Sequence, residues 1–146
     1  IILGAPGSGK TTALRDMIRL FSERGYRVGV ADERGEISGD GEFDLGPCSD
    51  VITGLGKAES AMLLLRGMNP QLIAMDEITQ SADADAIREL CCCGVELLAT
   101  AHARNADELR QRRVFAELLD TGAFKYALSI RGAGSARSYE LEGLYV

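Results

Sequence analysis

The segment at residues 4–12 combines glycine, lysine and hydroxyl side chains in a spacing that suits phosphate binding. It follows three apolar residues and consists of Gly4, Ala5, Pro6, Gly7, Ser8, Gly9, Lys10, Thr11 and Thr12. Glycine lets the backbone turn so that successive N–H groups point at phosphate oxygens, and the helix that follows directs the positive end of its dipole to the same place. In such a P-loop Lys10 can reach the β- and γ-phosphates, and the Thr11 hydroxyl can ligate Mg²⁺. The segment therefore predicts a site for a nucleoside triphosphate and Mg²⁺.

A pair of carboxylates follows a second apolar run, at residues 72–75. Asp76 ends this run, where a Walker B acid can hold Mg²⁺ through water, so we expect Thr11 and Asp76 to be the metal-binding side chains. Glu77 comes next, and a carboxylate there can polarise the attacking water as a general base. The same dipeptide also occurs as an ordinary solvated turn. Because the chain also contains a P-loop, the catalytic interpretation of Asp76 and Glu77 is preferred.

Two further polar groups follow apolar runs. His102, the one histidine of the chain, comes just after a strand expected at residues 95–100. That strand should lie between the P-loop strand and the Walker B strand, so His102 could sense the γ-phosphate; a packed or solvent-facing histidine is the alternative. Asp32, Glu33 and Arg34 end another strand. The acids could hold water or metal from the opposite side and Arg34 could pair with phosphate, or the triplet could be a charged loop.

Phosphoryl transfer also calls for a cation that stabilises the charge of the transition state, often an arginine from a neighbouring subunit. The candidates are Arg104, Arg110, Arg112, Arg113, Arg131 and Arg137. Arg131 is preferred because it lies between an expected strand and a glycine turn. The cluster at residues 110–113 is better interpreted as a solvated or interface face.

The elements that must position these side chains alternate between short β-rich runs and amphipathic stretches. We expect strands at 28–31, 71–75, 95–100, 126–130 and 138–146, and helices at 11–23, 58–68, 81–93 and 107–119, with Ser81 as a helix cap and a long loop at 35–56. Strands separated by helices indicate an α/β fold with a parallel sheet covered by helices on both faces. In such a sheet the ligand lies at the carboxyl ends of the strands, where the polar residues above collect.

Length and charge narrow the class of protein. A chain of 146 residues with 46% hydrophobic residues is expected to form one domain, residues 1–146. A net charge of −6 argues against a nucleic-acid partner. Four cysteines, three of them consecutive at 91–93, are expected to act as small apolar residues at a helix end in a reducing compartment. With no 18-residue apolar run and no signal segment, a cytoplasmic location is expected.

Four blocks of the chain resemble the family of stage III sporulation protein AA, an ATPase of endospore-forming bacteria. These are residues 4–12 (GAPGSGKTT), 28–36 (VGVADERGE), 64–78 (LLRGMNPQLIAMDEI) and 97–102 (LLATAH). The resemblance implies a RecA-like core akin to type II and type IV secretion ATPases, a hexameric ring, and a role in the mother cell energising a membrane-embedded channel complex to the forespore. By the same resemblance Asp32 and Glu33 correspond to an acidic box and His102 to a histidine box.

The chain departs from the family pattern in two respects. Secretion ATPases usually end the Walker B strand on Gly-Glu, whereas this chain has Asp76 and Glu77, so the metal and base roles could be divided differently. The family's N-terminal domain is also missing, and a strand that begins as the chain begins suggests a piece of a longer protein.

Taken together, the residues predict ATP hydrolysis with Glu77, Asp76, Glu33 and His102 as catalytic residues. The alternatives are a P-loop small-molecule kinase, which would need a lid with arginines that residues 36–56 do not contain, and a nucleotide-switched assembly module with little hydrolysis. A DNA-dependent recombinase-type ATPase remains open on fold alone. A GTPase is disfavoured because no Asn-Lys-x-Asp motif is present. The expected partners are further copies of the chain and channel proteins that hold it at the membrane.

Overall fold

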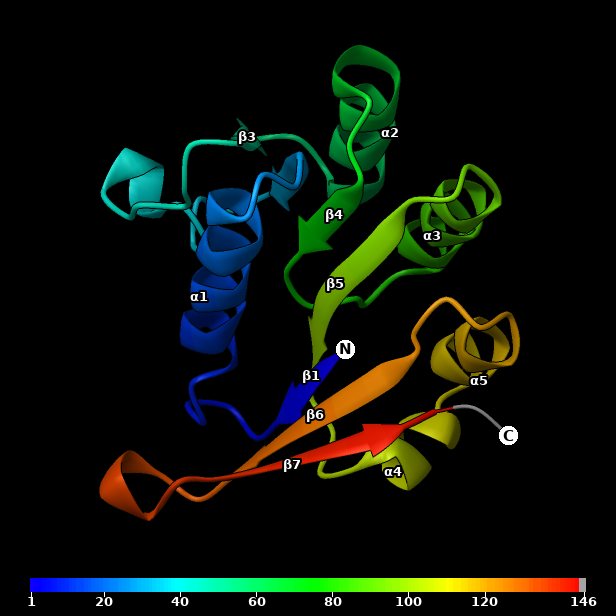
Figure 1. Ribbon diagram of the computed structural model, residues 1–146. Coiled ribbons are helices and arrows are strands. Elements are labelled where there is room, and N and C mark those ends of the chain that lie inside the picture. Colours follow the sequence, from blue (N-terminus) through cyan, green and yellow to red (C-terminus); the bar gives the residue numbers. More distant parts are fainter. Residues whose placement is uncertain (145–146) are drawn as a thin grey trace.

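A single twisted sheet runs through the protein, and the computed structural model describes it over residues 1–144. Within that range the strand order is β3-β2-β4-β5-β1-β6-β7 (Figure 1). The first six strands are parallel, and β7 runs antiparallel to β6. The bounds of the strands are β1 Ile2–Gly4, β2 Val28–Asp32, β3 Ser49–Thr53, β4 Leu72–Met75, β5 Glu96–Ala101, β6 Tyr126–Arg131 and β7 Ser138–Gly143.

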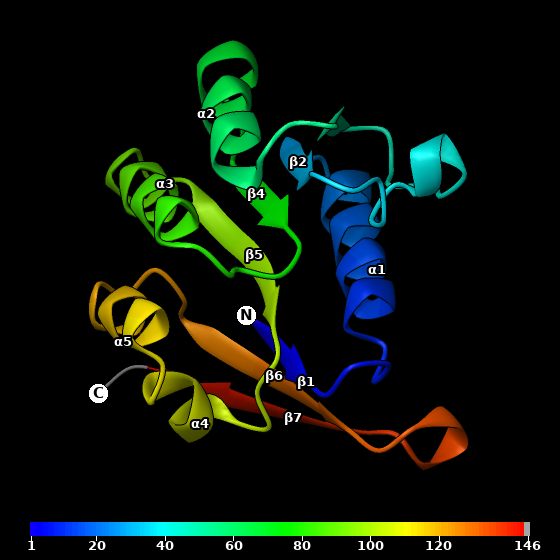
Figure 2. The same ribbon diagram turned by 180° about the vertical axis from the view of Figure 1, so that it is seen from behind.

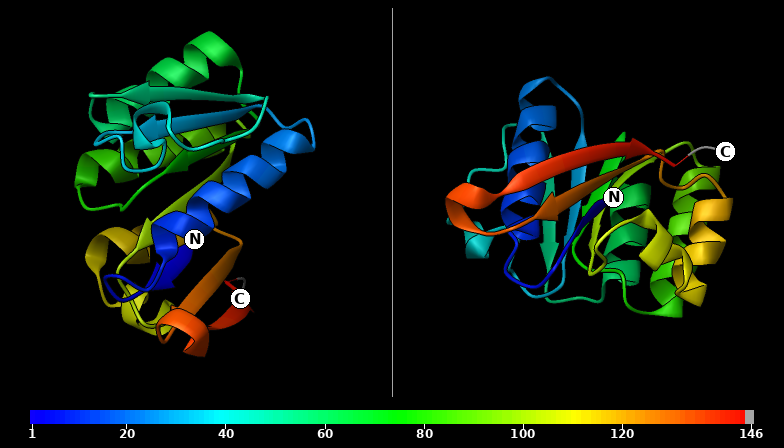
Figure 3. Two further views of the ribbon diagram at one scale, coloured as in Figure 1. Left: turned by 90° about the vertical axis from the view of Figure 1, so that its left-hand side faces the viewer. Right: turned by 90° about the horizontal axis from the view of Figure 1, so that it is seen from below.

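Helices cover both faces of the sheet, as the alternation of elements predicted. Their bounds are α1 Lys10–Glu23, α2 Lys57–Met68, α3 Ser81–Cys92, α4 Ala106–Arg110 and α5 Arg113–Asp120. Helix α1 lies on one face and the other four lie on the opposite face (Figures 2 and 3). Successive side chains of a strand point to opposite faces of the sheet. Val30 therefore belongs to the apolar cluster that contains Leu14 of α1, and Ala31 belongs to the cluster that contains Leu64 of α2.

The strand order places β5 between β1 and β4, as the sequence predicted for the strand before His102. Register pairs Ile2 of β1 with Thr100 of β5, and Ala74 of β4 with Leu98 of β5. Because these strands are parallel, their carboxyl ends lie at one edge of the sheet. That edge receives the loops that follow β1, β2, β4, β5 and β6.

Several elements differ from the sequence-based expectation. The long loop expected at 35–56 contains a short 3-10 turn, Gly39–Gly41, and the edge strand β3. The helix expected at 107–119 is two helices, because Arg112 is extended with φ −91° and ψ 121°. The N-cap of α3 is Gln80 rather than Ser81. The terminal strand ends at Gly143, and residues 145–146 of that expectation lie outside the described residues.

The consecutive cysteines only partly fit the expected packing at a helix end. Cys91 is half-buried and packs against the core under α3, where burial raises the pKa of its thiol. Cys92 and Cys93 are exposed. In the described part of the chain, no helix has both the length and the apolar character needed to cross a bilayer.

Candidate functional site

The P-loop connects the carboxyl end of β1 to the first turn of α1. Gly4 ends the strand, and a Cβ at this position would lie 2.3 Å from Ser8 Oγ and 3.1 Å from the carbonyl oxygen of Ile130. Gly9 is the N-cap of α1 and adopts a left-handed conformation with φ 100°, which L side chains disfavour. Glycine is therefore required at both ends of the loop, for space at the first and for backbone conformation at the second.

The loop presents polar groups that suit an anion. The N–H groups of the first turn of α1 have no acceptor within the helix, and the helix dipole adds a partial positive charge there. Ser8 donates its N–H to the Ala5 carbonyl at 3.1 Å, which closes the turn, whereas its buried hydroxyl has no hydrogen-bond partner among the described residues. Residues 5–7 are exposed and the Lys10 side chain closes the base of the loop. These features fit the phosphates of a nucleotide.

A chain of hydrogen bonds joins three elements at this edge of the sheet. Lys10 Nζ donates to the Ala5 carbonyl at 2.9 Å and lies 3.0 Å from His102 Nδ1. His102 Nε2 lies 3.1 Å from Glu77 Oε2. Because an ammonium group can only donate, Nδ1 accepts from Lys10, and Nε2 carries the hydrogen that is donated to Glu77. The P-loop, the end of β5 and the end of β4 are thereby brought into one site.

The charge state of Lys10 reflects this position. Burial lowers the pKa of its ammonium group, and the negative charges of Glu77 and Asp76 act in the opposite direction. The desolvation of the ammonium is the larger effect. A phosphate bound by the loop would supply the counter-charge that two carboxylates provide only in part.

Asp76 is oriented by two hydrogen bonds that fall on the same oxygen. The Thr100 hydroxyl donates to Asp76 Oδ1 at 2.7 Å, and the Glu77 N–H donates to it at 3.0 Å. The second carboxylate oxygen, Oδ2, is the one left for a metal or for metal-bound water. Thr100 thus links the end of β5 to the end of β4.

The acidic residues after β2 take two different positions. The Asp32 side chain is buried and turns into its own loop, where it accepts hydrogen bonds from Ile37 N at 3.0 Å, Ser38 N at 2.8 Å and Ser38 Oγ at 2.7 Å. Both acids line a small cavity of about 70 Å³ together with Asp76 and Glu77. The carboxylate oxygens of Asp32 accept the hydrogen bonds of its own loop, whereas the Glu33 carboxylate makes none of these bonds.

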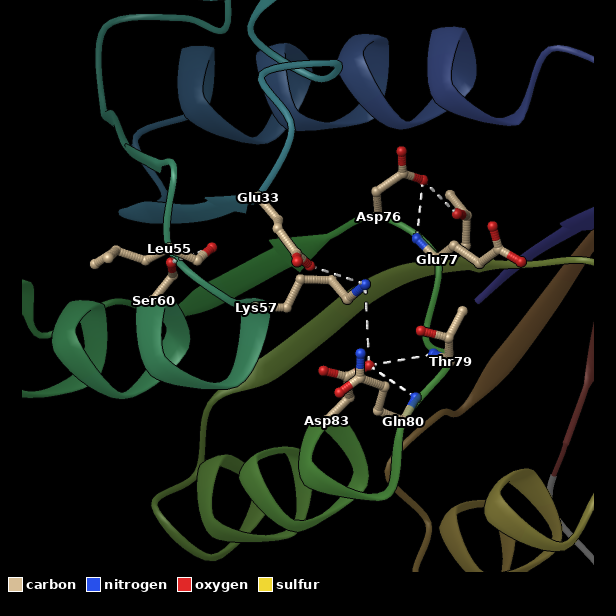
Figure 4. A network of polar contacts seen from close by, with 10 residues as sticks. Glu33, Leu55, Lys57, Ser60, Asp76, Glu77, Thr79, Gln80 and Asp83 are labelled. Atoms are coloured by element: carbon tan, nitrogen blue, oxygen red, sulfur yellow. Dashed lines mark hydrogen bonds and ion pairs between the residues drawn. The ribbon is translucent and has the colours of Figure 1, made fainter.

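Lys57 is a member of this site that sequence reasoning missed. Its ammonium lies 3.4 Å from Glu33 Oε2 and 4.0 Å from Asp83 Oδ2, between the two carboxylates (Figure 4). Asp83 also accepts hydrogen bonds from the N–H groups of Thr79 and Gln80, each at 3.1 Å, and so caps α3. The one available signal is the position of Lys57 at the start of α2, directly after the turn that follows β3.

Two candidate arginines, at the end of β6 and in the turn after it, lie in different surroundings. Arg131, the preferred candidate for a transition-state cation, forms an ion pair with Glu140 across β6 and β7 at 2.7 Å. Arg137 lies against Gly9 of the P-loop, with its Cζ 3.1 Å from the position of a Cβ on that residue. Arg34 is exposed and lines the small cavity beside Glu33.

The oxygen groups of the site fit Mg²⁺ held jointly with a nucleotide. Among residues 1–144 no three His, Cys, Asp or Glu side chains converge on a point where they could hold a metal by themselves. Thr11 and Asp76 offer a hydroxyl and a carboxylate, and Mg²⁺ typically takes one or two such protein ligands and completes its shell with water and phosphate oxygens. The residues present therefore suit Mg²⁺ that arrives with a nucleotide.

A larger cavity of about 700 Å³ lies at the opposite edge of the sheet, by the amino ends of the strands. Its walls include Ile1, Tyr26, Pro70 and Phe124, and none of the expected site residues lines it. The candidate chemistry is confined to the carboxyl edge.

Solved structures with a similar fold include a secretion ATPase and a pilus retraction motor. The VirB11 ATPase of the Brucella suis type IV secretion system matches 97% of this chain and 47% of its own, with a TM-score of 0.73 and 16% identity. The pilus retraction motor PilT matches 97% of this chain and 46% of its own, with a TM-score of 0.69 and 18% identity. These likenesses confirm the expected P-loop, RecA-like fold.

Sequence relatives identify a narrower group. Stage III sporulation protein AA of Bacillus subtilis (strain 168) is 33% identical over 156 aligned residues, which cover 98% of this chain and 51% of that protein. The protein ycf45 of Porphyra purpurea is 32% identical, over 86% of this chain and 23% of its own length. The chain thus spans about half the length of the Bacillus relative. The model of the family "Sporulation stage III, protein AA" matches residues 1–145, and the chain belongs to that family.

Proposed function

We propose that the chain is an ATP-hydrolysing motor domain whose site lies at the carboxyl edge of the sheet. The observation that carries this proposal is the chain of contacts from Lys10 through His102 to Glu77, with 3.0 Å and 3.1 Å between the atoms. It connects a phosphate-binding loop to a carboxylate able to act as a base. An adenine nucleotide is favoured over a guanine nucleotide because the guanine-reading motif is missing.

Each side chain has a role in this proposal. Residues 4–12 hold the phosphates, with Lys10 as the main counter-charge, while Thr11 and Asp76 bind the metal. Bound Mg-ATP supplies the phosphoryl group and the cation that neutralises it. Glu77 orients the attacking water and accepts its proton, and Glu33 helps to position that water from the other side of the cavity.

His102 relays the state of the phosphates between Lys10 and Glu77. It contacts both side chains, so a phosphate that draws the Lys10 ammonium toward itself weakens the bond to Nδ1. The imidazole is then free to shift, and with it the hydrogen bond that holds Glu77. In this proposal the hydrogen bond from His102 restrains the Glu77 carboxylate, and a shift of the imidazole releases the base.

We extend the proposal from residues 1–146 to the whole protein in which such a domain works. Membership of the sporulation family supports a homo-oligomeric motor, a ring of six by resemblance, that works in the cytoplasm of the mother cell against membrane-embedded channel proteins. Residues 1–146 would be its ATPase domain. The likeness to a pilus retraction motor solved with bound ADP supports nucleotide binding by this type of fold.

Replacement of Glu77 by glutamine tests the assignment of the base. Glu77→Gln keeps the shape and a hydrogen bond to His102 but removes the proton acceptor. We expect steady-state ATP turnover to fall by about 10²- to 10⁴-fold, the range typical for loss of a general base, with ATP affinity changed by less than about threefold. Release of phosphate and titration calorimetry measure the two quantities.

Glu59→Gln is the matched control, because Glu59 is an exposed glutamate of α2 outside the small cavity. It should leave turnover unchanged. Full turnover in Glu77→Gln with intact affinity would remove Glu77 from the role of base. Tight ATP binding without measurable turnover in the unaltered chain would instead favour the nucleotide-switched assembly module.

A further inference from the structure

The turn between β6 and β7 lies beside the P-loop. Strand β6 pairs with β1 so that Ile130 lies opposite Gly4, the residue at which the P-loop begins. Beyond Arg131 the chain forms a short 3-10 turn, Gly134–Ala136, and Arg137 then leads into β7. Figure 2 shows this turn and the loop between β1 and α1 at the same edge of the sheet.

The Arg137 guanidinium covers Gly9. Its Cζ, Nη1 and Nη2 atoms lie 3.1, 3.2 and 3.3 Å from the position that a Cβ on Gly9 would occupy. Any side chain at residue 9 would therefore have to displace this group. Since Gly9 directly precedes Lys10, the guanidinium provides a second positive charge next to the phosphate-binding lysine.

Arg137 lacks the acceptors that an arginine in this position requires. Its Nε is buried and makes no hydrogen bond within the described residues, and no ion pair of the guanidinium is found there. Arg131, at the end of β6, is paired with Glu140. A buried N–H without an acceptor is costly, and guanidinium groups match phosphate oxygens particularly well. An anion bound at the P-loop would supply such an acceptor.

The strand order indicates which part of a nucleotide Arg137 would meet. His102 and the carboxylates Asp76 and Glu77 lie at the ends of β5 and β4, on one side of β1. Arg137 approaches from the other side, next to β6. It therefore reaches the P-loop from the side away from the groups that would act on the γ-phosphate.

We propose that Arg137 binds, within its own chain, a phosphate oxygen common to ATP and ADP, and so determines nucleotide affinity rather than the rate of the chemical step. This role differs from that of an arginine finger, which acts on the transferred phosphoryl group. Because the inference rests on nucleotide binding at the P-loop, its test measures affinity separately from turnover.

The experiment is calorimetric titration of the chain with ADP and with a non-hydrolysable ATP analogue. Arg137→Gln is expected to raise both dissociation constants by a similar factor, about 10- to 100-fold, as for the loss of a hydrogen bond to a charged group. At saturating ATP its turnover should stay within about twofold of the unaltered chain. Arg137→Lys, which keeps the charge but not the planar fork, should recover part of the affinity.

Arg66→Gln controls for the loss of one positive charge, because Arg66 is exposed near the end of α2 that points away from the P-loop edge. It should leave both dissociation constants unchanged. Thermal unfolding of Arg137→Gln shows whether the variant is folded. If its stability falls, the nucleotide affinity of Arg137→Lys still tests the role of the guanidinium.

Three results would overturn the inference: unchanged affinity in Arg137→Gln, tighter binding, or lost turnover with unchanged ADP affinity. Tighter binding would mean that the guanidinium obstructs the free P-loop, and lost turnover that it acts on the transferred group. Lys10→Ala separates the two proposals. If Lys10→Ala leaves ADP and ATP binding intact, the P-loop site itself is wrong, whereas a chain that binds nucleotide without hydrolysing it fails only the proposed activity.

Discussion

Lys10 is the residue on which most of the site converges. Its ammonium donates to the Ala5 carbonyl within the loop and to His102 at the end of β5. These bonds hold the charge at the base of the loop while no phosphate is present. Burial lowers its pKa and only the partial compensation by Glu77 and Asp76 opposes that effect. The free site is therefore prepared for an anion, which stabilises the protonated lysine far better than the carboxylates do.

This balance predicts opposite pH dependences for binding and for stability. Phosphates bind the protonated form of Lys10, so the dissociation constant for ADP should rise as pH increases through the lowered pKa, below the value of about 10.4 usual for lysine. In the same range the unfolded chain binds more protons at this residue than the folded chain does. The contribution of Lys10 to the free energy of unfolding should thus become more favourable with rising pH.

Calorimetric titration of ADP from pH 7 upward measures the first effect, and urea unfolding of the nucleotide-free chain measures the second. Lys10→Arg is the control, since an arginine stays charged throughout this range. Any ADP affinity that it retains should be independent of pH there. An ADP affinity that does not change with pH in the unaltered chain would contradict a lowered pKa of the Lys10 ammonium.

At the scale of elements, the loop after β2 depends on one carboxylate. Buried Asp32 organises residues 33–38 by accepting hydrogen bonds from two backbone N–H groups and one hydroxyl. That loop places Glu33 at the small cavity, where Glu33 Oε2 forms an ion pair with Lys57 Nζ of α2 at 3.4 Å. Asp32 thus holds the loop with its carboxylate, while Glu33 forms the ion pair with Lys57.

Asp32→Ala should accordingly act mainly on the stability of the loop rather than directly on the chemistry of the site. Loss of three hydrogen bonds to a charged acceptor, with the N–H groups of Ile37 and Ser38 left buried, should cost about 3 kcal/mol in free energy of unfolding. Hydrogen exchange of those two amides should accelerate. Asp44→Ala removes an exposed carboxylate of the same loop whose one hydrogen bond within residues 1–144 comes from Gly46 N at 2.8 Å, and it should cost less than about 1 kcal/mol. Equal effects of the two variants would deny Asp32 its organising role.

How far the sequence predicts an element depends on whether its cause is local. The P-loop and the strand before Asp76 are contiguous motifs, and both were predicted within a residue or two of their bounds. Strand β3 was missed because a five-residue edge strand with mostly exposed or half-buried side chains has little apolar pattern, and pairing with β2 creates it. Lys57 and Arg137 reach the site only through tertiary contacts, which spacing along the chain does not encode.

At the scale of the whole molecule, the site is open on the side where the γ-phosphate is expected. Glu77 and His102 keep 39% and 36% of their side-chain surface exposed. Lys10 is the only lysine or arginine among the described residues that contacts His102 or Glu77, while Arg137 approaches from the opposite side of β1 and Arg131 is paired with Glu140. Under the proposed hydrolysis, a second copy of the chain would supply the transition-state cation.

Turnover per chain should therefore rise with protein concentration. We expect steady-state Mg-ATP hydrolysis per chain to increase steeply over the range in which sedimentation shows self-association, because each newly formed interface completes a site with an arginine supplied in trans. The proposed assembly motor requires this dependence, whereas a site complete within one chain does not. Constant turnover per chain across a range in which the protein remains monomeric would place every catalytic group within residues 1–146. In that case Arg34, which already lines the cavity beside Glu33, would be the arginine to replace next.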